Sequence, residues 1–352
     1  MKKHANIPIF IPHEGCKNEC VFCNQRTITG TCKGSDRDIT EEIESALATI
    51  PKDYEVEIAF FGGSFTGIGK DKMTRLLDTA NRYIKDGRVQ SIRLSTRPDY
   101  IDNEILDILK SRGVTHIELG IQSMKQNVLD ACKRGHTTED TQKACKLIND
   151  YGFILGGQMM IGLPGSTPED EIYTSEKIGQ MGAKEARIYP CVVFRGTELC
   201  DMAQSELYRP ISVEEAVERT KNVFYKLKAY KINILRIGLQ SSESLSDNKE
   251  VYAGAYHPAM GELVMSSINL DRILYAINKY KTNKPLFAEK ELIVECNKSD
   301  LSKVIGHKKS NMEIIRKAAC EAGLSEINIK TSDKVENGCL QIHFGQETEI
   351  QD

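Results

Sequence analysis

Short runs of apolar residues alternate with longer amphipathic segments over the first 230 residues of the chain. The short runs are rich in β-branched and aromatic residues, which is typical of buried strands. The longer segments repeat their apolar residues with the period of a helix. Strands are predicted at residues 7–11, 55–61, 91–95, 116–121, 157–161 and 187–193, and helices at residues 40–50, 71–85, 103–111, 138–151, 168–181 and 213–230.

This alternation predicts an α/β fold built from parallel βαβ units. Two of the predicted helices carry start signals, because Thr40 precedes Glu41 and Thr167 precedes Pro168. Six such units fit a partial (β/α)6 barrel that is open on one side. In barrels of this kind the chemistry follows the carboxyl ends of the strands, so we expect the functional residues there.

The last third of the chain has a different pattern, which predicts a second, smaller domain. Residues 241–256 are rich in Ser, Asp, Asn and Glu, and a helical pattern then continues to about residue 280. From residue 285 onward short strands and helices alternate again. We therefore expect a barrel at residues 1–240, a connecting or cap segment at 241–284, and a small α/β domain at 285–352.

One loop of this small domain resembles the GXXG loop of KH-type modules, which clamps the backbone of single-stranded RNA. Gly306 opens the loop, but Lys309 stands where the second glycine would be. A side chain at that position hinders close approach of a nucleic acid backbone. Lys308 and Lys309 are candidate phosphate contacts. A solvated loop on a small docking domain is the favoured interpretation, and a degenerate KH-like unit is the alternative.

Composition restricts the partners and the surroundings of the protein. The net charge of −3 and the pI of about 6.2 show no global signature of nucleic acid binding, so any RNA contact has to be a local patch. The 11 cysteines have irregular spacings, and no signal peptide or bilayer-spanning apolar run is visible. These features predict a cytoplasmic protein with no membrane contact and no disulfide framework.

Three cysteines near the N-terminus, Cys16, Cys20 and Cys23, form a C-x3-C-x2-C triplet. Three thiolates can hold three irons of a 4Fe-4S cluster and leave the fourth iron open to a substrate or cofactor. Phe22 would shield such a cluster from water. The alternative is a structural zinc site completed by Cys32 and His13, although no second C-x2-C pair is present. The other eight cysteines have no cluster spacing.

The cysteine triplet resembles that of the radical S-adenosylmethionine (SAM) superfamily, in which SAM binds the open iron. The resemblance implies two cofactors, a 4Fe-4S cluster and SAM, and it gives roles to residues at the strand ends. A glycine turn after the second strand would bind the SAM amino group, and the third strand end would present a guanidinium and a hydroxyl to the carboxylate. An amide after the fourth strand would bind the ribose, and a methionine after the fifth would approach the adenine. The implied residues are Gly62, Gly63, Ser64, Ser95, Arg97, Gln122 and Met160.

Several of these residues also have purely structural explanations. Tight turns from a strand to a helix need glycine whether or not they bind a ligand. Arg97 is able to pair with Asp99 two residues later. Met160 is as well explained by a core position as by a contact with adenine.

Five ordered segments narrow the resemblance. They are STRPD, HIELGIQS, RGHTTED, MMIGLPGSTPED and RIYPCVVFRGTEL. Together they resemble the radical SAM half of the Elongator catalytic subunit, a family that modifies the wobble uridine of tRNA. The resemblance covers residues 1–240. This chain departs from that family in two ways. The family spaces its first two cluster cysteines more widely than Cys16 and Cys20 are spaced here. No acetyl-CoA loop is visible after residue 240, so neither acetyltransferase activity nor acetyl-CoA is expected.

The same resemblance suggests that His136, Tyr189 and Arg195 face the substrate, with Tyr189 as a catalytic candidate. Each has a structural alternative: a hydrogen bond at a helix start, a partly buried aromatic ring and a surface cation, respectively.

The function implied by these residues is that of a radical SAM enzyme. It would take one electron from an external reductant of the ferredoxin or flavodoxin type, cleave SAM reductively to a 5′-deoxyadenosyl radical and act on RNA, with tRNA as the expected substrate. Two alternatives remain. One is a radical SAM enzyme on a small molecule such as a tetrapyrrole, as in oxygen-independent coproporphyrinogen oxidases. The other is a non-enzymatic protein that binds an Fe-S cluster or zinc.

Overall fold

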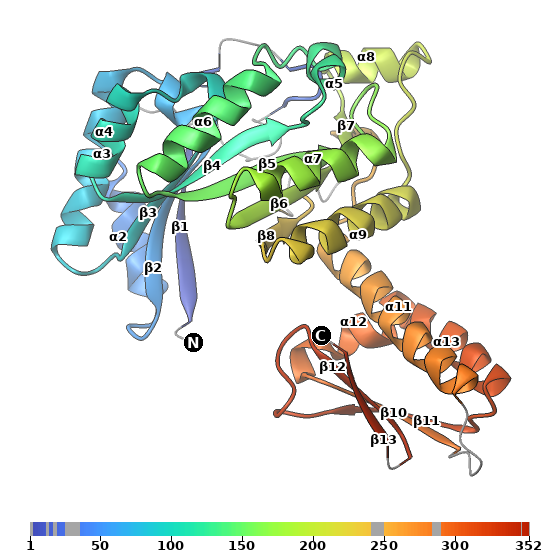
Figure 1. The fold of residues 1–352 in the computed structure, drawn as a ribbon. Coiled ribbons are helices and arrows are strands. Elements are labelled where there is room, and N and C mark those ends of the chain that lie inside the picture. Colours follow the sequence, from blue (N-terminus) through green and yellow to red (C-terminus); the bar gives the residue numbers. More distant parts are fainter. Residues whose placement is uncertain are drawn as a thin grey trace. The chain divides into compact units, whose positions relative to one another are not determined.

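The computed structural model describes residues 3–11, 14–16, 20–24, 36–240, 250–283, 290–345 and 347–351. The chain divides into two compact units, Met1–Pro258 and Ala259–Asp352. In Figure 1 the first unit runs from blue to yellow and the second from orange to red. The helix over residues 260–282 belongs to the second unit, and the separate cap segment at 241–284 stays a prediction.

One seven-stranded parallel sheet organises the first unit, in the order β1-β2-β3-β4-β5-β6-β8. The sheet curls into a half-barrel whose outer face carries the intervening helices (Figure 1). The predicted partial barrel is therefore confirmed, with one strand more than expected. The strands are β1 His4–Ile11, β2 Glu55–Gly62, β3 Ser91–Thr96, β4 Val114–Gln122, β5 Ile154–Ile161, β6 Glu185–Pro190 and β8 Asn233–Ile237.

Six helices of this unit lie close to their predicted positions, and two short ones, at residues 126–131 and 198–204, were not expected. Helix α7 starts as its sequence indicates, with Pro168 in the first turn and a capping box between Thr167 and Asp170. The helices are α2 Thr40–Thr49, α3 Lys70–Lys85, α4 Asn103–Ser111, α5 Gln126–Ala131, α6 Thr138–Asp150, α7 Pro168–Gln180, α8 Glu198–Gln204 and α9 Val213–Ala229.

Two strand predictions need correction. The run at 187–193 is not one strand: β6 ends at Pro190, and a short strand β7, Val192–Phe194, pairs antiparallel with β9, Val251–Gly254. Proline lacks the amide hydrogen that a central strand needs, which explains the break. Strand β8 was missed because its five residues are only partly buried or exposed, so they lack the apolar run of a central strand.

The inner face of the half-barrel holds a buried group of charged side chains, here called the lumen cluster. It consists of Glu57, Arg93, Glu118, Glu185 and Arg187. Arg93 donates to all three carboxylates, at 2.7 Å, 3.0 Å and 2.6 Å respectively. Arg187 forms a two-bond pair with Glu118 at 2.6 Å and 3.1 Å. Each buried carboxylate of the cluster therefore has a guanidinium partner, as burial of charge requires.

Electrostatics in the lumen cluster keep the carboxylates of Glu57 and Glu118 ionised. Burial alone would raise the pKa of Glu57, but the hydrogen bond from His116 and the charge of Arg93 lower it to about 2. Burial also opposes ionisation of Glu118, whose pKa Arg187 and Arg93 nevertheless hold below its ordinary range. The part of the barrel interior that the lumen cluster occupies is therefore filled with paired charges.

The second unit contains a four-stranded mixed sheet in the order β11-β10-β12-β13. Strand β10 pairs in parallel with β11 and antiparallel with β12. Helices α11 and α13 bury Ile277 and Ile315 against Val294 and Ile342 of the sheet. The elements are α11 Met260–Thr282, β10 Glu291–Cys296, η3 Lys298–Asp300, α12 Leu301–Ile305, η4 His307–Lys309, α13 Ser310–Glu321, β11 Glu326–Thr331, β12 Leu340–Phe344 and β13 Glu347–Gln351. The predicted small α/β unit is confirmed, and β13 was not expected.

No helix in the part of the chain that the structure describes is long and apolar enough to cross a membrane.

Candidate active site

A cavity of about 570 Å³ lies in the first unit. It receives residues from the carboxyl-terminal halves of β2, β3, β4, β5 and β6, together with residues of the cysteine segment. Its size lies within the roughly 300–1,000 Å³ typical of small-molecule sites. The cavity is therefore where the sequence places the chemistry, at the strand ends.

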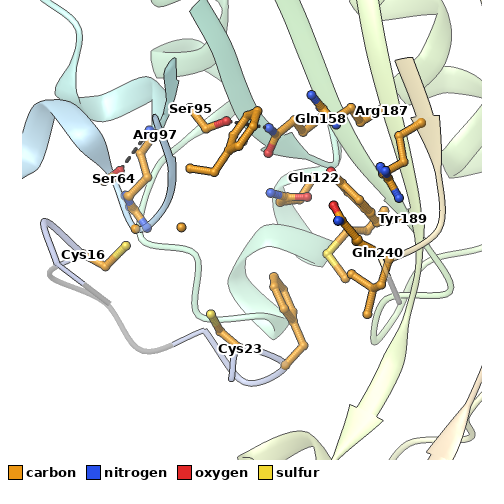
Figure 2. Close-up of a pocket in the computed structure, with 18 of the residues that line it drawn as sticks. Cys16, Cys23, Ser64, Ser95, Arg97, Gln122, Gln158, Arg187, Tyr189 and Gln240 are labelled. Carbon is orange, nitrogen blue, oxygen red and sulfur yellow. Dashed lines mark hydrogen bonds between the residues drawn. The ribbon is translucent and has the colours of Figure 1, made fainter. Parts of the chain in front are cut away.

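Two of the three predicted cluster cysteines, Cys16 and Cys23, line this cavity together with Phe22. Figure 2 shows the sulfur atoms of Cys16 and Cys23 on the same side of it. Cys20 is buried beside them and accepts a hydrogen bond from Arg134 Nη1 at 3.1 Å. Among the described residues no three His, Cys, Asp or Glu side chains gather closely enough to hold a metal ion. His13 and Cys32, the candidates for a zinc site, lie outside the described residues.

The glycine turn after β2 is interlocked with the segment that carries Cys16. The amide of Gly63 donates to the Ile11 carbonyl at 2.7 Å, and the amide of Ser64 donates to the Glu14 carbonyl at 3.0 Å. A Cβ atom at Gly63 would collide with the Glu14 carbonyl, and one at Gly15 would collide with the Ser64 carbonyl. Glycine is needed here for close contact between two backbone segments. Gly62, Gly63 and Ser64 all line the cavity.

Residues at the end of β3 leave a guanidinium nitrogen unused. Arg97 binds Asp99 through Nε and Nη2 at 2.9 Å and 3.0 Å, as the structural alternative expected. Its Nη1 atom is buried and has no hydrogen bond partner in the described structure. The backbone amide of Arg97 donates to Ser64 Oγ at 3.0 Å, which ties the two strand ends together (Figure 2). An unpaired buried donor facing a cavity is suited to an anionic ligand group.

Strands β3, β4 and β5 contribute further predicted residues. Gln122, at the end of β4, has a left-handed backbone (φ 64°), and its buried Oε1 atom has no partner among the described residues. Such strained, unsatisfied positions gather at functional sites. Ser95 lines the cavity and accepts a hydrogen bond from Gln158 Nε2 at 2.9 Å, and Met160 lines the cavity as well.

His136 was expected to face the substrate, but it is not among the residues that line the cavity. It is 1% exposed, and neither ring nitrogen has a hydrogen bond partner in the described residues. Burial, together with the charges of Arg134 and Arg97, lowers the pKa of His136 to about 3. The ring is therefore neutral at physiological pH.

The burial of neutral His136 predicts that the protein loses stability in acid and that this loss depends on His136. The folded pKa of His136 lies below the ordinary value of 6.5, so its stabilising effect is complete above pH 6.5 and is lost as the pH falls toward 3. At pH 5 we expect a loss of about 2 kcal/mol of unfolding free energy, measured by urea titration. His136→Gln should flatten the stability curve between pH 6.5 and 5. An unchanged slope in this variant would contradict the assignment.

The other two predicted substrate residues lie in different places. Tyr189 on β6 lines the cavity, and burial raises the pKa of its phenol, which therefore stays protonated. Arg195 is not among the cavity residues and lies over the ring of Tyr252, with 5.5 Å between the guanidinium carbon and the ring centroid. Lys308 and Lys309 are part of the second unit.

Sequence reasoning missed several polar residues of the cavity. Arg134 was overlooked although it precedes His136 in a segment that carried the family resemblance. Alternation along β5, β6 and β8 could have identified the others, since these strands turn every second side chain inward. The residues are Gln158, Arg187 and Arg236, and Gln240 follows β8.

Comparison with known proteins agrees with this arrangement. Residues 10–176 match the radical SAM superfamily, and residues 183–269 match the radical SAM C-terminal domain. The tRNA uridine(34) acetyltransferase of Methanocaldococcus jannaschii is 37% identical over 134 residues, which cover 37% of this chain and 25% of that protein. This chain therefore spans about a quarter of the length of that relative.

Two further similarities cover more of the chain. The heme chaperone HemW of Bacillus subtilis is 23% identical over 243 residues, 66% of this chain and 64% of that one. The solved structure of Methanocaldococcus infernus Elp3, lacking its N-terminus, superposes with a TM-score of 0.61 and 24% identity, covering 77% of this chain and 64% of that one. That superposition shows a shared fold. Enzymes of the radical SAM superfamily bind a 4Fe-4S cluster and SAM. Because the chain matches both consecutive domains of these enzymes, it belongs to the radical SAM superfamily.

Proposed function

We propose that the protein is a radical SAM enzyme that binds a 4Fe-4S cluster through Cys16, Cys20 and Cys23 and acts on RNA, with tRNA as the first candidate. The observation that carries the proposal is the convergence on one cavity of two of these cysteines, the glycine turn and the polar strand ends. Each of these features comes from a different βα unit of the barrel.

The residues present fit both cofactors. Three thiols supply the soft donors that Fe-S clusters require. The unpaired Arg97 Nη1 and Gln122 Oε1 are a donor and an acceptor left without partners in the described structure, and SAM offers a carboxylate and ribose hydroxyls. When bound, such a cluster would supply the single electron for reductive cleavage of SAM.

The chain's own side chains would then bind and orient. Arg97 would pair with the SAM carboxylate while Asp99 holds its other two nitrogens in place. Gln122 would bind the ribose, and Phe22 and Met160 would exclude water from the cysteine side of the cavity. Tyr189, protonated because of its burial, would donate a hydrogen bond to the substrate.

An RNA substrate is supported by the tRNA-modifying relative and by the second unit. Within that unit the loop at 306–309 joins α12 to α13 and carries three basic side chains. Lys308 and Lys309 adopt left-handed backbones, with φ of 52° and 64°. We propose that this loop contacts RNA phosphates.

Anaerobic SAM cleavage tests the proposed function. The protein would be reconstituted with iron and sulfide, reduced with dithionite and given SAM with or without bulk tRNA. Release of 5′-deoxyadenosine that rises with tRNA would support both the chemistry and the substrate. Cleavage indifferent to tRNA would move the search to small molecules. No cleavage with a well-formed cluster would favour a binding protein.

Replacement of Lys309 by glycine separates backbone strain from charge in the loop. The left-handed backbone costs a lysine about 1 kcal/mol more than glycine, so Lys309→Gly should raise the unfolding free energy by that amount. If the loop binds RNA, the same variant should lower the slope of log affinity against log salt by roughly 0.7, one phosphate contact. Lys317→Gly, an exposed position inside α13, should instead destabilise by about 1 kcal/mol. A Lys309→Gly variant no more stable than the parent would contradict the strain argument.

A tetrapyrrole substrate is the second candidate. It is supported by the similarity to a heme chaperone, which extends over 66% of this chain. Titration of the protein with coproporphyrin should then shift the porphyrin absorption band, and 5′-deoxyadenosine release should rise with porphyrin and not with tRNA.

A further inference from the structure

The end of the cavity away from the cysteines contains a cation, Arg236, that has no carboxylate partner among the described residues. In Figure 2, Arg187, Tyr189 and Gln240 lie across the cavity from Cys16. Arg236, on β8, lines the same cavity and is half-buried. Within the described ranges no carboxylate lies within 4.0 Å of its guanidinium, whereas Arg187 is paired with Glu118.

The strand register places the positive charge of Arg236 beside that of Arg187, which is unfavourable. Arg187 and Arg236 are directly paired on neighbouring parallel strands, so both side chains project from the same face of the sheet. Adjacent like charges on a sheet destabilise each other. The carboxylates of the lumen cluster give no relief, because Arg93 and Arg187 already occupy them.

Neutral polar side chains line the same cavity as Arg236. The phenol of Tyr189 is close enough for the charge of Arg236 to act on it. Gln158 and Gln240 add amide groups to the same cavity, although Gln158 already donates to Ser95 and Glu118. A guanidinium fork with a nearby hydroxyl donor is a common way to hold a carboxylate or a phosphate.

We propose that Arg236 binds an oxyanion of the substrate, a phosphate or a carboxylate, at the end of the cavity opposite the cysteines. The inference rests on the proposed function in that it treats this cavity as the substrate site. It makes Arg236 a specificity residue: substrates would be anions, held by their charged group while the reacting carbon faces the cysteine end. Two sources of the anion remain, a nucleotide phosphate and the carboxylate of a small molecule.

Thermal unfolding of the full-length protein with small anions tests this directly. Sodium phosphate and sodium propionate serve as the probes, with sodium chloride at matched ionic strength as the reference. A ligand that binds only the folded state raises the melting midpoint with its concentration. We expect such a rise in the parent protein with at least one probe, and the effective probe distinguishes the phosphate from the carboxylate source.

Three variants locate the effect. Arg236→Gln should weaken probe binding about tenfold or more, since a charged hydrogen bond is lost. Arg236→Lys keeps the charge without the fork and should retain part of the binding. Arg82→Gln removes an exposed arginine of α3 in the same unit and should behave as the parent.

The outcomes separate this inference from the proposed function, because neither cluster nor SAM is needed. No midpoint rise with either probe, or an equal rise in Arg236→Gln and the parent, would overturn the assignment of Arg236. The reconstituted protein could instead show a rise in melting midpoint that depends on Arg236 but no SAM cleavage. That result would contradict the proposed chemistry and still support the anion site.

Discussion

Cys20→Ala should leave the protein without a 4Fe-4S cluster and without SAM cleavage. The cluster would lose one of the three thiolates proposed to hold it. Cys20 is buried, and Arg134 donates to its sulfur at 3.1 Å. The variant therefore also removes one hydrogen bond acceptor of Arg134. We expect iron and sulfide content to fall to background and 5′-deoxyadenosine release to be undetectable.

Cys320→Ala is the matched control, because Cys320 is an exposed cysteine of the second unit. It should keep the iron content, the visible absorption and the cleavage rate of the parent. Circular dichroism should show that both variants are folded. SAM cleavage by a folded Cys20→Ala protein would mean that the cluster is held elsewhere.

Arg93→Met should lower the free energy of unfolding by about 3–5 kcal/mol, the effect of removing one partner from a buried ion pair. Arg93 is 4% exposed and is the only donor that reaches all three carboxylates of the lumen cluster in the described structure. Without it Glu57 keeps only its histidine contacts and the hydrogen bond from Ser91. Urea denaturation measures the change.

An exposed pair provides the comparison for Arg93. Arg88 binds Glu44 through two hydrogen bonds of 2.9 Å and 3.0 Å, but both side chains are nearly half exposed. Arg88→Met should therefore lower the free energy of unfolding far less than Arg93→Met does. Similar losses in the two variants would show that the interior of the barrel is open to water.

The fold was predictable wherever burial made the sequence simple. Strand β2 carries an apolar run at residues 58–61, and β3 alternates the buried Ile92 and Leu94 with polar residues, so both patterns identify a strand. Helices α4 and α7 carry cap residues that fix their first turns. Strand β8 has neither signal, so its place in the sheet depends on contacts with β6 that local sequence does not encode.

The candidate site was predictable where a motif carried it and not where the barrel assembled it. Cys16, Gly63 and Arg97 belong to short sequence patterns. Arg93 and Arg187 are of a residue type usually found at the surface. Only the closure of the sheet brings them to the buried Glu118. His136 shows the opposite limit, because its motif suggested a ligand contact, whereas in the structure it is buried and is not among the residues that line the cavity.

The contact between the Cys16 segment and the glycine turn bears on the exchange of parts between related enzymes. Gly15 and Gly63 each leave room for a carbonyl of the other segment, so the two loops fit as a pair. A chimera that receives only a foreign cysteine loop would place a mismatched backbone on residues 62–67. Grafts should therefore carry both segments together, with residues 14–24 and 62–67 treated as one exchangeable cassette.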